Sequence, residues 1–164
     1  MTIVWITGLP SSGKSTLAER LRERLVADQR SAIVLDGDDV RHALGIHGYE
    51  AAARDDFYRA LAELSALIAR QGPIVIVAAT APSRAHRELA RTLSSSFVEV
   101  FVDTPLDECT RRDTKGLYAA ARRGDVSTLP GGGAAYEPPL APDVIAHGGQ
   151  DEVAVAAIAK RIER

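Results

Sequence analysis

Eight residues near the start of the chain have the types and spacing that bind phosphate groups. Gly8 to Ser15 match the pattern G-x-x-x-x-G-K-[ST]. Small residues let successive backbone N–H groups turn towards a phosphate, while Lys14 can reach the outer phosphates and Ser15 can bind Mg²⁺. We expect a nucleoside triphosphate to contact Gly8, Leu9, Pro10, Ser11, Ser12, Gly13, Lys14, Ser15 and Thr16.

Two carboxylates, Asp36 and Asp38, follow the strand predicted at 31–35. At the carboxyl end of that strand they would lie at the same sheet edge as the phosphate loop. Asp36 can face the metal and its waters, while Asp38 accepts the proton of an attacking hydroxyl. A lone Asp-Gly-Asp is more often a solvated turn, but its place beside a phosphate loop favours catalysis. We predict Asp38 and Lys14 as catalytic residues, and Ser15 and Asp36 as Mg²⁺ ligands.

The surrounding sequence narrows the class of nucleotide-binding protein. A guanine-reading motif would need Asp where Thr114-Lys115-Gly116-Leu117 has Leu117. Motor-type ATPases place an acid after the strand beside the first, but Thr80-Ala81-Pro82 follows the strand at 74–79. These absences favour an ATP-dependent kinase over a GTPase or a motor.

Several cations are candidates for holding an anionic second substrate or the transferring phosphoryl group. Each on its own is as often solvated as functional. The candidates are Arg41, Arg54, Arg59, Arg84, Arg112 and Lys115. The four histidines lack the spacing of a zinc site, so we expect no metal other than Mg²⁺.

The segments that must position these residues alternate between strand and helix. Apolar runs predict buried strands at 2–7 and 74–79 and further strands at 31–35 and 97–102, with a last short strand at 143–146. Helical spacing predicts helices at 14–29, 51–70, 82–93 and 151–164, the last with Val153, Ala157 and Ile158 facing inward. This alternation indicates an α/β three-layer sandwich of the P-loop NTPase, nucleotide-kinase-like type, with a parallel five-stranded sheet.

A different composition occupies the segment at about 111–142. It is rich in Arg, then in Gly and Pro, and includes Pro130-Gly131-Gly132-Gly133. A plain surface loop is the alternative, but about 30 irregular residues in so small a domain usually serve a function. We expect this segment to be a mobile lid within one kinase domain that spans 1–164.

Composition and charge restrict the partners and the compartment. The chain has 46% hydrophobic and 26% charged residues, and its net charge of -2 gives no reason to expect a nucleic-acid partner. No apolar run approaches the roughly 20 residues of a membrane span. Cys109 is the only cysteine, and we expect it to be a buried thiol in a reducing compartment. The expected protein is cytoplasmic and not bound to a membrane.

Several motifs in this order resemble the adenylyl-sulfate kinase (APS kinase) family. The matching pieces are 8–16, Leu35-Asp36-Gly37-Asp38-Asp39-Val40-Arg41-His42, 97–106, Arg112-Asp113-Thr114-Lys115-Gly116-Leu117-Tyr118, Pro82-Ser83-Arg84 and Tyr136-Glu137-Pro138. Together they cover about 3–145. The family transfers the γ-phosphoryl of ATP to the 3′-hydroxyl of adenosine 5′-phosphosulfate, using Mg²⁺ and commonly as a dimer. The resemblance implies that activity, a place in sulfate assimilation and a homodimer.

The same resemblance implies roles for individual residues. Asp38 would be the base, Arg41 and Arg54 would hold the phosphosulfate, and Tyr49 would take the place of a Phe that stacks on the substrate adenine. Lys115 would line the acceptor site. Arg112 would lie over the adenine of ATP.

Departures from the family pattern gather where the acceptor would bind. Phe57 stands where the family has Asn, Ala81 where it has Ser, and Leu129 where it has a Phe that closes over the substrate adenine. We include Phe57, Ala81 and Leu129 among the predicted substrate-binding residues. They leave two alternatives open: a related kinase that phosphorylates another small-molecule hydroxyl, and a nucleotide-binding module without transfer activity.

Overall fold

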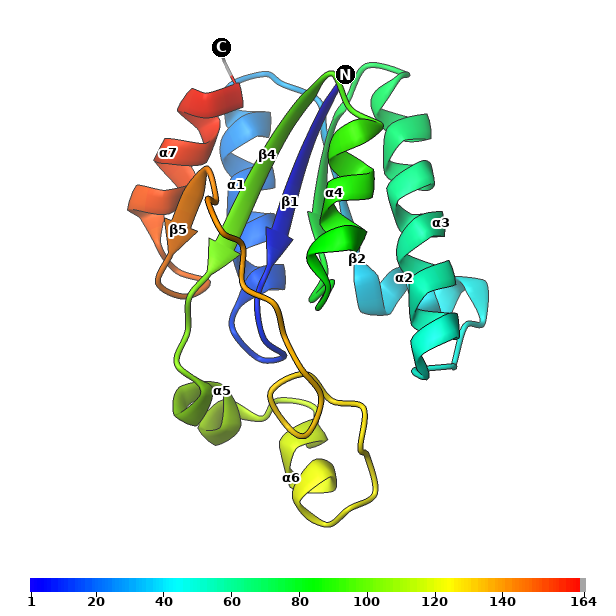
Figure 1. Cartoon of the computed structure of the whole chain (residues 1–164). Coiled ribbons are helices and arrows are strands. Elements are labelled where there is room, and N and C mark those ends of the chain that lie inside the picture. The colour runs from blue at the N-terminus through cyan, green and yellow to red at the C-terminus, as the bar shows by residue number, and fades with distance from the viewer. Residues whose placement is uncertain (163–164) are drawn as a thin grey trace.

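The computed structural model describes residues 1–162 and contains a parallel sheet between two layers of helices (Figure 1). The strands are β1 (Thr2–Thr7), β2 (Ala32–Asp36), β3 (Ile74–Ala78), β4 (Ser96–Val102) and β5 (Val144–Ala146). Their order across the sheet is β2-β3-β1-β4-β5, and every neighbouring pair is parallel. The predicted five-stranded α/β sandwich is therefore confirmed.

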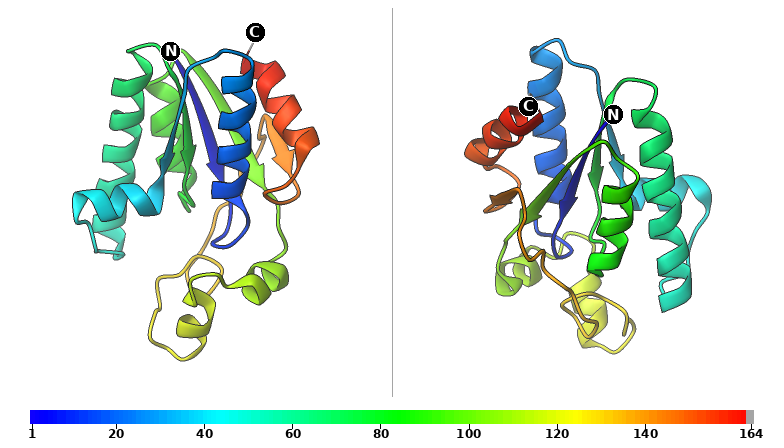
Figure 2. Two further views of the ribbon diagram at one scale, coloured as in Figure 1. Left: turned by 180° about the vertical axis from the view of Figure 1, so that it is seen from behind. Right: turned by 45° about the horizontal axis from the view of Figure 1, so that its top comes forward.

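Helices cover both faces of this sheet. The helices in the described part of the chain are α1 (Lys14–Ala27), α2 (Gly37–Leu44), α3 (Ala51–Ala69), α4 (Arg84–Thr92), α5 (Leu106–Arg112), α6 (Leu117–Arg122) and α7 (Glu152–Ile162). Helices α1 and α7 pack on one face, and α3 and α4 pack on the other (Figure 2). Helices α5 and α6 lie beyond the carboxyl ends of the strands (Figure 1).

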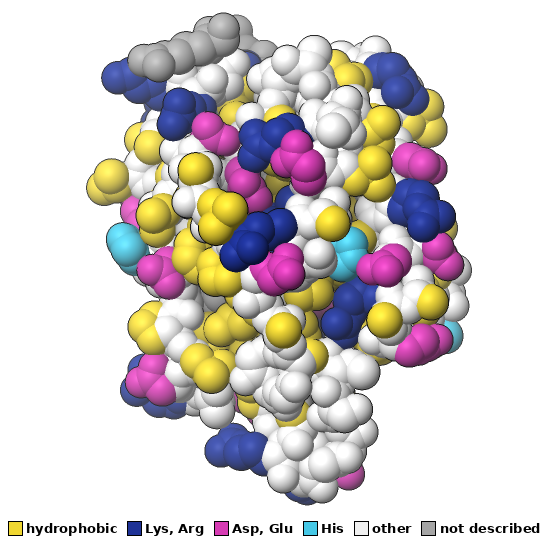
Figure 3. Space-filling view, viewed as in Figure 1, with side chains coloured by type: hydrophobic (Ala, Val, Ile, Leu, Met, Phe, Trp, Pro, Cys, Tyr) yellow, Lys and Arg dark blue, Asp and Glu magenta, His cyan; other side chains and the backbone are white. Residues whose placement is uncertain are grey.

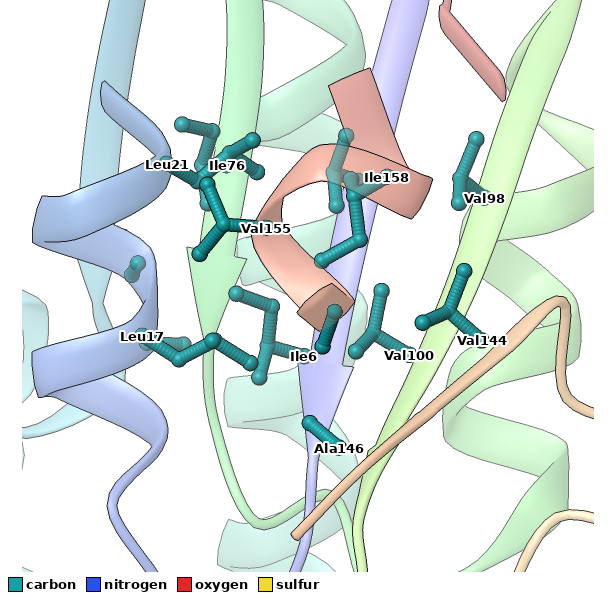
Figure 4. Close-up of a cluster of buried hydrophobic side chains, with 14 of the residues drawn as sticks. Ile6, Leu17, Leu21, Ile76, Val98, Val100, Val144, Ala146, Val155 and Ile158 are labelled. Atoms are coloured by element: carbon teal, nitrogen blue, oxygen red, sulfur yellow. The ribbon is translucent and has the colours of Figure 1, made fainter. Parts of the chain in front are cut away.

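The two cores on either side of strand β1 explain why its sequence is an uninterrupted apolar run. Val4 and Ile6 belong to the core under α1 and α7, whereas Ile3 and Trp5 belong to the core under α3 and α4. Figure 4 shows Ile6 among the side chains of the first core. Because a central parallel strand is buried on both faces, successive side chains are apolar although they point in opposite directions.

The strand register brings the predicted carboxylates to the phosphate loop. Asp36 of β2 lies opposite Ala78 of β3, which in turn lies opposite Ile6 of β1. The chain leaves β1 one residue later, at Thr7, and enters the phosphate loop. Asp36 therefore lies at the same edge of the sheet as that loop.

A helix occupies residues 37–44, where the sequence analysis expected only an acidic turn. The Asp36 carboxylate accepts a hydrogen bond from the Asp38 N–H at 2.9 Å and caps the helix amino terminus. Asp is among the preferred residues at such caps. The Asp-Gly-Asp sequence thus begins α2 and fixes the direction in which Asp38 leaves it.

The ends and faces of two other helices differ from the prediction. Helix α4 begins at Arg84 rather than at 82, because the Ser83 hydroxyl caps it. In α7 the prediction that Val153 faces inward is wrong, since Val153 is 81% exposed, whereas Val155 and Ile158 are buried. The apolar stripe is displaced by about one residue from the predicted one. Residues 163–164 of the predicted helix lie outside the described part of the chain.

The segment from 113 to 143, between α5 and β5, contains regular structure although its composition is rich in Gly and Pro. It contains α6 and a small apolar cluster of Tyr118 and Leu129 against Cys109 of α5. Cys109 is buried, as predicted. We call residues 113–143 the connecting segment. Among the helices of residues 1–162, none is long and apolar enough to cross a membrane.

Candidate active site

The phosphate loop links the carboxyl end of β1 to the amino terminus of α1. The Ser12 N–H donates to the Leu9 carbonyl at 3.2 Å, and the Thr104 hydroxyl donates to the Ser12 carbonyl at 2.8 Å. Gly13 has a φ of 107° and packs so closely on Gly149 that a Cβ would lie 2.5 Å from the Gly149 nitrogen. The loop is thereby held at a helix amino terminus, where backbone N–H groups and the helix dipole attract phosphate.

Lys14 lies within the loop and donates from Nζ to the Leu9 carbonyl at 2.7 Å. Burial lowers the pKa of Lys14 to about 8, although Asp38 and Asp36 act in the opposite direction. A charged ammonium without enough water around it is stabilised by anions. The electrostatics at Lys14 therefore favour binding of a polyphosphate.

Ser15 and Asp36 bring two oxygen ligands together beside the loop. The Ser15 hydroxyl donates a hydrogen bond to Asp36 Oδ2, while Asp36 Oδ1 accepts from the Asp38 backbone. Hydroxyl and carboxylate oxygens are hard ligands of the kind that Mg²⁺ uses next to nucleotide phosphates. The donor set fits Mg²⁺.

Asp38 forms an ion pair with Lys115 across the cavity. Asp38 lies on α2, and Lys115 lies on the connecting segment. Burial of Lys115 opposes its protonation, but the hydrogen bond and charge of Asp38 outweigh burial and raise the pKa of Lys115. Both side chains are more than half exposed, so the pair can open when a substrate enters.

The wall opposite the phosphate loop contains Arg41, Tyr49 and Phe57. The guanidinium carbon of Arg41 lies 4.6 Å from the centroid of the Tyr49 ring and 3.8 Å from that of Phe57. Arg41 Nη1 also donates to the Gly48 carbonyl at 2.9 Å. This wall combines a buried positive charge with two aromatic rings.

Arg54 connects helix α3 to the connecting segment. Its Nη2 donates to the Thr128 carbonyl at 2.7 Å, next to Leu129. Leu129 is buried in the small cluster with Tyr118 and also lines the cavity. Arg54 therefore lines the cavity and also holds the connecting segment through its backbone.

Arg112 lies over the phosphate loop. Its Nη1 donates to the Ser12 carbonyl at 3.3 Å, and its Nη2 pairs with Glu108 one helical turn earlier. The Tyr118 hydroxyl donates to the Pro10 carbonyl at 2.9 Å. Helices α5 and α6 are thus attached to the phosphate loop by side-chain contacts with its backbone.

One cavity of about 430 Å³ joins most of the predicted site residues. Those that line it are Pro10, Ser11, Gly13, Lys14, Ser15, Thr16, Asp36, Asp38, Arg41, Tyr49, Arg54, Phe57, Arg112, Lys115 and Leu129. Gly8, Leu9, Ser12 and Ala81 do not line it. Of the candidate cations, Arg59 pairs with Asp56 outside the cavity, and Arg84 donates to the Pro138 carbonyl.

Ala81 is buried behind the cavity wall, in a backbone conformation with a φ of 40°. Its N–H donates to the Tyr58 hydroxyl at 2.9 Å, and its carbonyl accepts from Arg87 Nη1 at 2.5 Å. The neighbours Thr80 and Pro82 line the cavity instead. Ala81 therefore shapes the wall through the backbone.

Sequence reasoning missed Tyr58, Thr80 and Thr128, which line the cavity, and Arg87, which lies behind it. Tyr58 follows Phe57 on α3, where a second aromatic residue reads as core. No local pattern distinguishes Arg87 from other helical arginines. Its position became evident only from its contacts with distant segments.

Basic and acidic side chains are interspersed on the face shown in Figure 3, without a continuous patch of either sign. Inside the cavity, by contrast, Lys14, Arg41, Arg54, Arg112 and Lys115 contribute positive charge to one lining. The molecule combines a parallel sheet, a phosphate loop with Lys14 at its carboxyl edge, two carboxylates and a second wall that carries Arg41. This combination defines an ATP-dependent P-loop kinase that uses an alcohol acceptor.

Comparison with known proteins gives the family. The family model described as adenylylsulphate kinase matches residues 1–147. Adenylyl-sulfate kinase of Aeromonas hydrophila is 46% identical over 145 residues, which cover 87% of this chain and 74% of that protein. The bifunctional enzyme NodQ of a Rhizobium species is also 46% identical over 145 residues, but these cover only 22% of its length. The chain belongs to the adenylylsulphate kinase family, as the sequence motifs indicated.

A solved structure agrees with this assignment. The Mycobacterium tuberculosis APS kinase CysC, in complex with AMPPNP and APS, matches with a TM-score of 0.90 and 38% identity. The match covers 99% of this chain and 98% of that one. The whole described fold is therefore that of an APS kinase.

Proposed function

We propose that this protein transfers the γ-phosphoryl group of ATP to the 3′-hydroxyl of adenosine 5′-phosphosulfate. The observation that carries the proposal is a single cavity in which the phosphate loop faces Asp38 and the Arg41 wall. Donor and acceptor could be held there in line, which is the main requirement of phosphoryl transfer. The family relative solved with AMPPNP and APS supports the same pair of substrates.

In the proposed mechanism, each residue acts on a defined atom. Lys14 and the amino terminus of α1 hold the outer phosphates of ATP. Asp38 accepts the proton of the acceptor's 3′-hydroxyl while the hydroxyl oxygen bonds to the γ-phosphorus of ATP. The bond between the γ-phosphorus and the β,γ-bridging oxygen breaks, which releases ADP. Lys115 neutralises Asp38 until the acceptor enters. Lys14 then stabilises the charge that develops on the leaving phosphate.

Ser15 and Asp36 are the residues proposed to hold Mg²⁺. Their hydrogen-bonded oxygens lie next to Lys14 at the start of α1. Mg²⁺ held there would neutralise part of the negative charge of the ATP phosphates. The capping role of Asp36 on α2 keeps its carboxylate directed at that position.

The anionic end of the acceptor is assigned to Arg41 and Arg54, and its adenine to Tyr49. The connecting segment would act as the lid, because it contacts both walls of the cavity. Its Thr128 carbonyl accepts a hydrogen bond from Arg54 of α3, and its Tyr118 hydroxyl donates one to Pro10 of the phosphate loop. Closing it would exclude water from the transferring group. Self-association as a homodimer is part of the proposal.

The test is a product analysis with purified protein, ATP, Mg²⁺ and adenosine 5′-phosphosulfate. Mass spectrometry and phosphorus NMR should show a 3′-phosphorylated product together with ADP. If a sample that binds ATP forms no such product, the proposed acceptor is wrong.

The residues at two positions favour a second candidate function, which is transfer of the phosphoryl group to a different small-molecule hydroxyl. Phe57 and Leu129 line the acceptor side of the cavity, and both differ from the family pattern. A screen of other hydroxyl compounds, with ADP release as the readout, separates this candidate from the first. ADP release with another compound, but not with adenosine 5′-phosphosulfate, would establish it.

A further inference from the structure

Arg41 is a buried cation without a carboxylate partner in the described part of the chain. It is 6% exposed, although it lines the cavity. Its hydrogen bond to the Gly48 carbonyl occupies Nη1. A buried charge is costly unless other groups stabilise it, so its surroundings must explain why it is kept there.

Two aromatic rings stabilise the buried charge of Arg41. The Phe57 ring lies 3.8 Å from the guanidinium carbon of Arg41, and the Tyr49 ring lies 4.6 Å from it. Aromatic faces attract a desolvated cation, and they do so best for the planar guanidinium. Among the described residues, Gly48 is the one hydrogen-bond acceptor of this guanidinium, so its other N–H donors are free for an anion.

The two rings differ in how firmly they are held. Tyr49 lies in the loop between α2 and α3 and is 50% exposed. Phe57 is on α3, is 3% exposed and packs edge-on against Tyr58, with a centroid distance of 5.2 Å. Phe57 is therefore the fixed surface against which the Arg41 guanidinium packs.

We infer that Phe57 is a positioning residue, which orients Arg41 so that its edge meets the anionic group of the acceptor. The inference rests on the proposed function, because it assigns the acceptor's anion to Arg41. Phe57 itself makes no polar contact with the acceptor. It replaces the Asn implied by the family resemblance with a ring that acts through Arg41.

This arrangement makes a prediction about substrates. An acceptor with a charged group at Arg41 depends on the orientation of the guanidinium, whereas binding of ATP at the phosphate loop does not. Loss of the ring should therefore weaken acceptor binding selectively. A residue that served only the stability of the fold would affect both ligands.

The first experiment compares Phe57→Leu, Phe57→Tyr and the control Phe97→Leu. Phe97 carries a similar arginine contact, with Arg91 at 4.7 Å, but it does not line the cavity. Phe57→Leu should raise the KM for adenosine 5′-phosphosulfate roughly 3- to 30-fold, the range expected for a desolvated cation–aromatic contact. The kcat and the Kd for ATP of Phe57→Leu should stay within about twofold. Phe97→Leu should resemble the unmodified protein, and Phe57→Tyr, which keeps a ring, should raise the acceptor KM less than Phe57→Leu.

An unchanged acceptor KM in Phe57→Leu overturns the inference, and so does an equal loss of ATP affinity. If Phe57→Leu does not fold, Phe57→Met takes its place, because it keeps a similar volume without a ring.

A second measurement is independent of turnover. The side-chain Nε–H resonance of Arg41, assigned by its loss in Arg41→Lys, should be displaced by the ring currents of the stacked rings. It should move in Phe57→Leu and stay in Phe97→Leu. If the unmodified protein fails to phosphorylate adenosine 5′-phosphosulfate while this resonance behaves as expected, the proposed function fails and the stacking stands. An Arg41 resonance that does not respond to Phe57→Leu refutes the positioning role.

Discussion

At the scale of single residues, Lys14 couples ATP binding to pH. Its pKa is lowered to about 8 by burial, so the unliganded protein loses this proton as the pH rises through about 8. The phosphates of ATP favour the ammonium and raise that pKa again. ATP binding should therefore take up close to one proton at about pH 9 and much less at about pH 7.5, and the affinity should fall above about pH 8.

Calorimetry in two buffers of different ionisation enthalpy measures this uptake. Lys14→Arg is the matched control, since its guanidinium stays charged throughout this range. Equal proton uptake by the control and the unmodified protein would exclude Lys14 as the source.

Asp38 offers a second prediction at this scale. Asp38→Asn removes the proposed base and should lower kcat by about 10²- to 10⁴-fold, with little change in the Kd for ATP. Asp39→Asn changes the neighbouring carboxylate on α2, which does not line the main cavity, and should retain activity. The measurement is steady-state kinetics with a separate ATP titration. Similar kcat values for the two variants would contradict the assignment of Asp38.

At the scale of elements, helix α7 depends on the carboxylate that precedes it. Asp151 accepts hydrogen bonds from the backbone of His147 at 3.0 Å and of Ala154 at 2.9 Å, and these bonds lower its pKa. Because the folded pKa is the lower one, the stabilisation is complete above the ordinary value of 3.8 and is lost as the pH falls through the folded value.

Asp151→Ala should lower the free energy of unfolding by about 1 kcal/mol at neutral pH. Urea unfolding at neutral and at acid pH measures the effect, and the difference from the unmodified protein should shrink in acid. Glu152→Gln is the control, because its exposed pair with Arg20 contributes little. A difference that is independent of pH would show that the carboxylate charge plays no part.

At the scale of the whole molecule, Arg87 joins the cavity wall to the end of the connecting segment. It is 2% exposed and pairs with Glu99 at 2.8 Å, while its other nitrogens donate to the carbonyls of Ala81 and Glu137. Residues 81 and 137 belong to different segments, and Glu99 belongs to β4. One buried side chain therefore holds the acceptor side of the sheet and the base of the proposed lid together.

Arg87→Met should lower the free energy of unfolding by about 3 kcal/mol, because within residues 1–162 it leaves the buried Glu99 carboxylate with Arg91 as its one cationic partner. Arg91→Met, which removes the more exposed of the two arginines, should cost about 1 kcal/mol or less. Urea unfolding of both variants compares them directly. Equal losses would show that burial of Arg87 does not decide the energetics of this cluster.

Local sequence patterns were sufficient for much of this molecule. The apolar runs predicted the five strands, and their burial on both faces explains the runs of the central strands β3, β1 and β4. The edge strands β2 and β5 leave Ile33 and Ile145 exposed. The spacing from Gly8 to Ser15 predicted the phosphate loop, because its residues are consecutive and their backbone forms the cradle. The burial of Val153 was predicted wrongly, because apolar spacing alone cannot decide which of several adjacent residues faces a sheet.

The sequence by itself determined the strand order along the chain, the phosphate loop and the presence of Asp36 and Asp38 after the second strand. Only the tertiary structure decided which side chains meet. Asp38 pairs with Lys115 across 77 residues, Arg54 reaches Thr128 across 74, and Arg41 contacts rings from two other segments. The reason is physical: contacts between residues far apart in the chain depend on how helices and segments pack on the sheet, and no local periodicity records that packing.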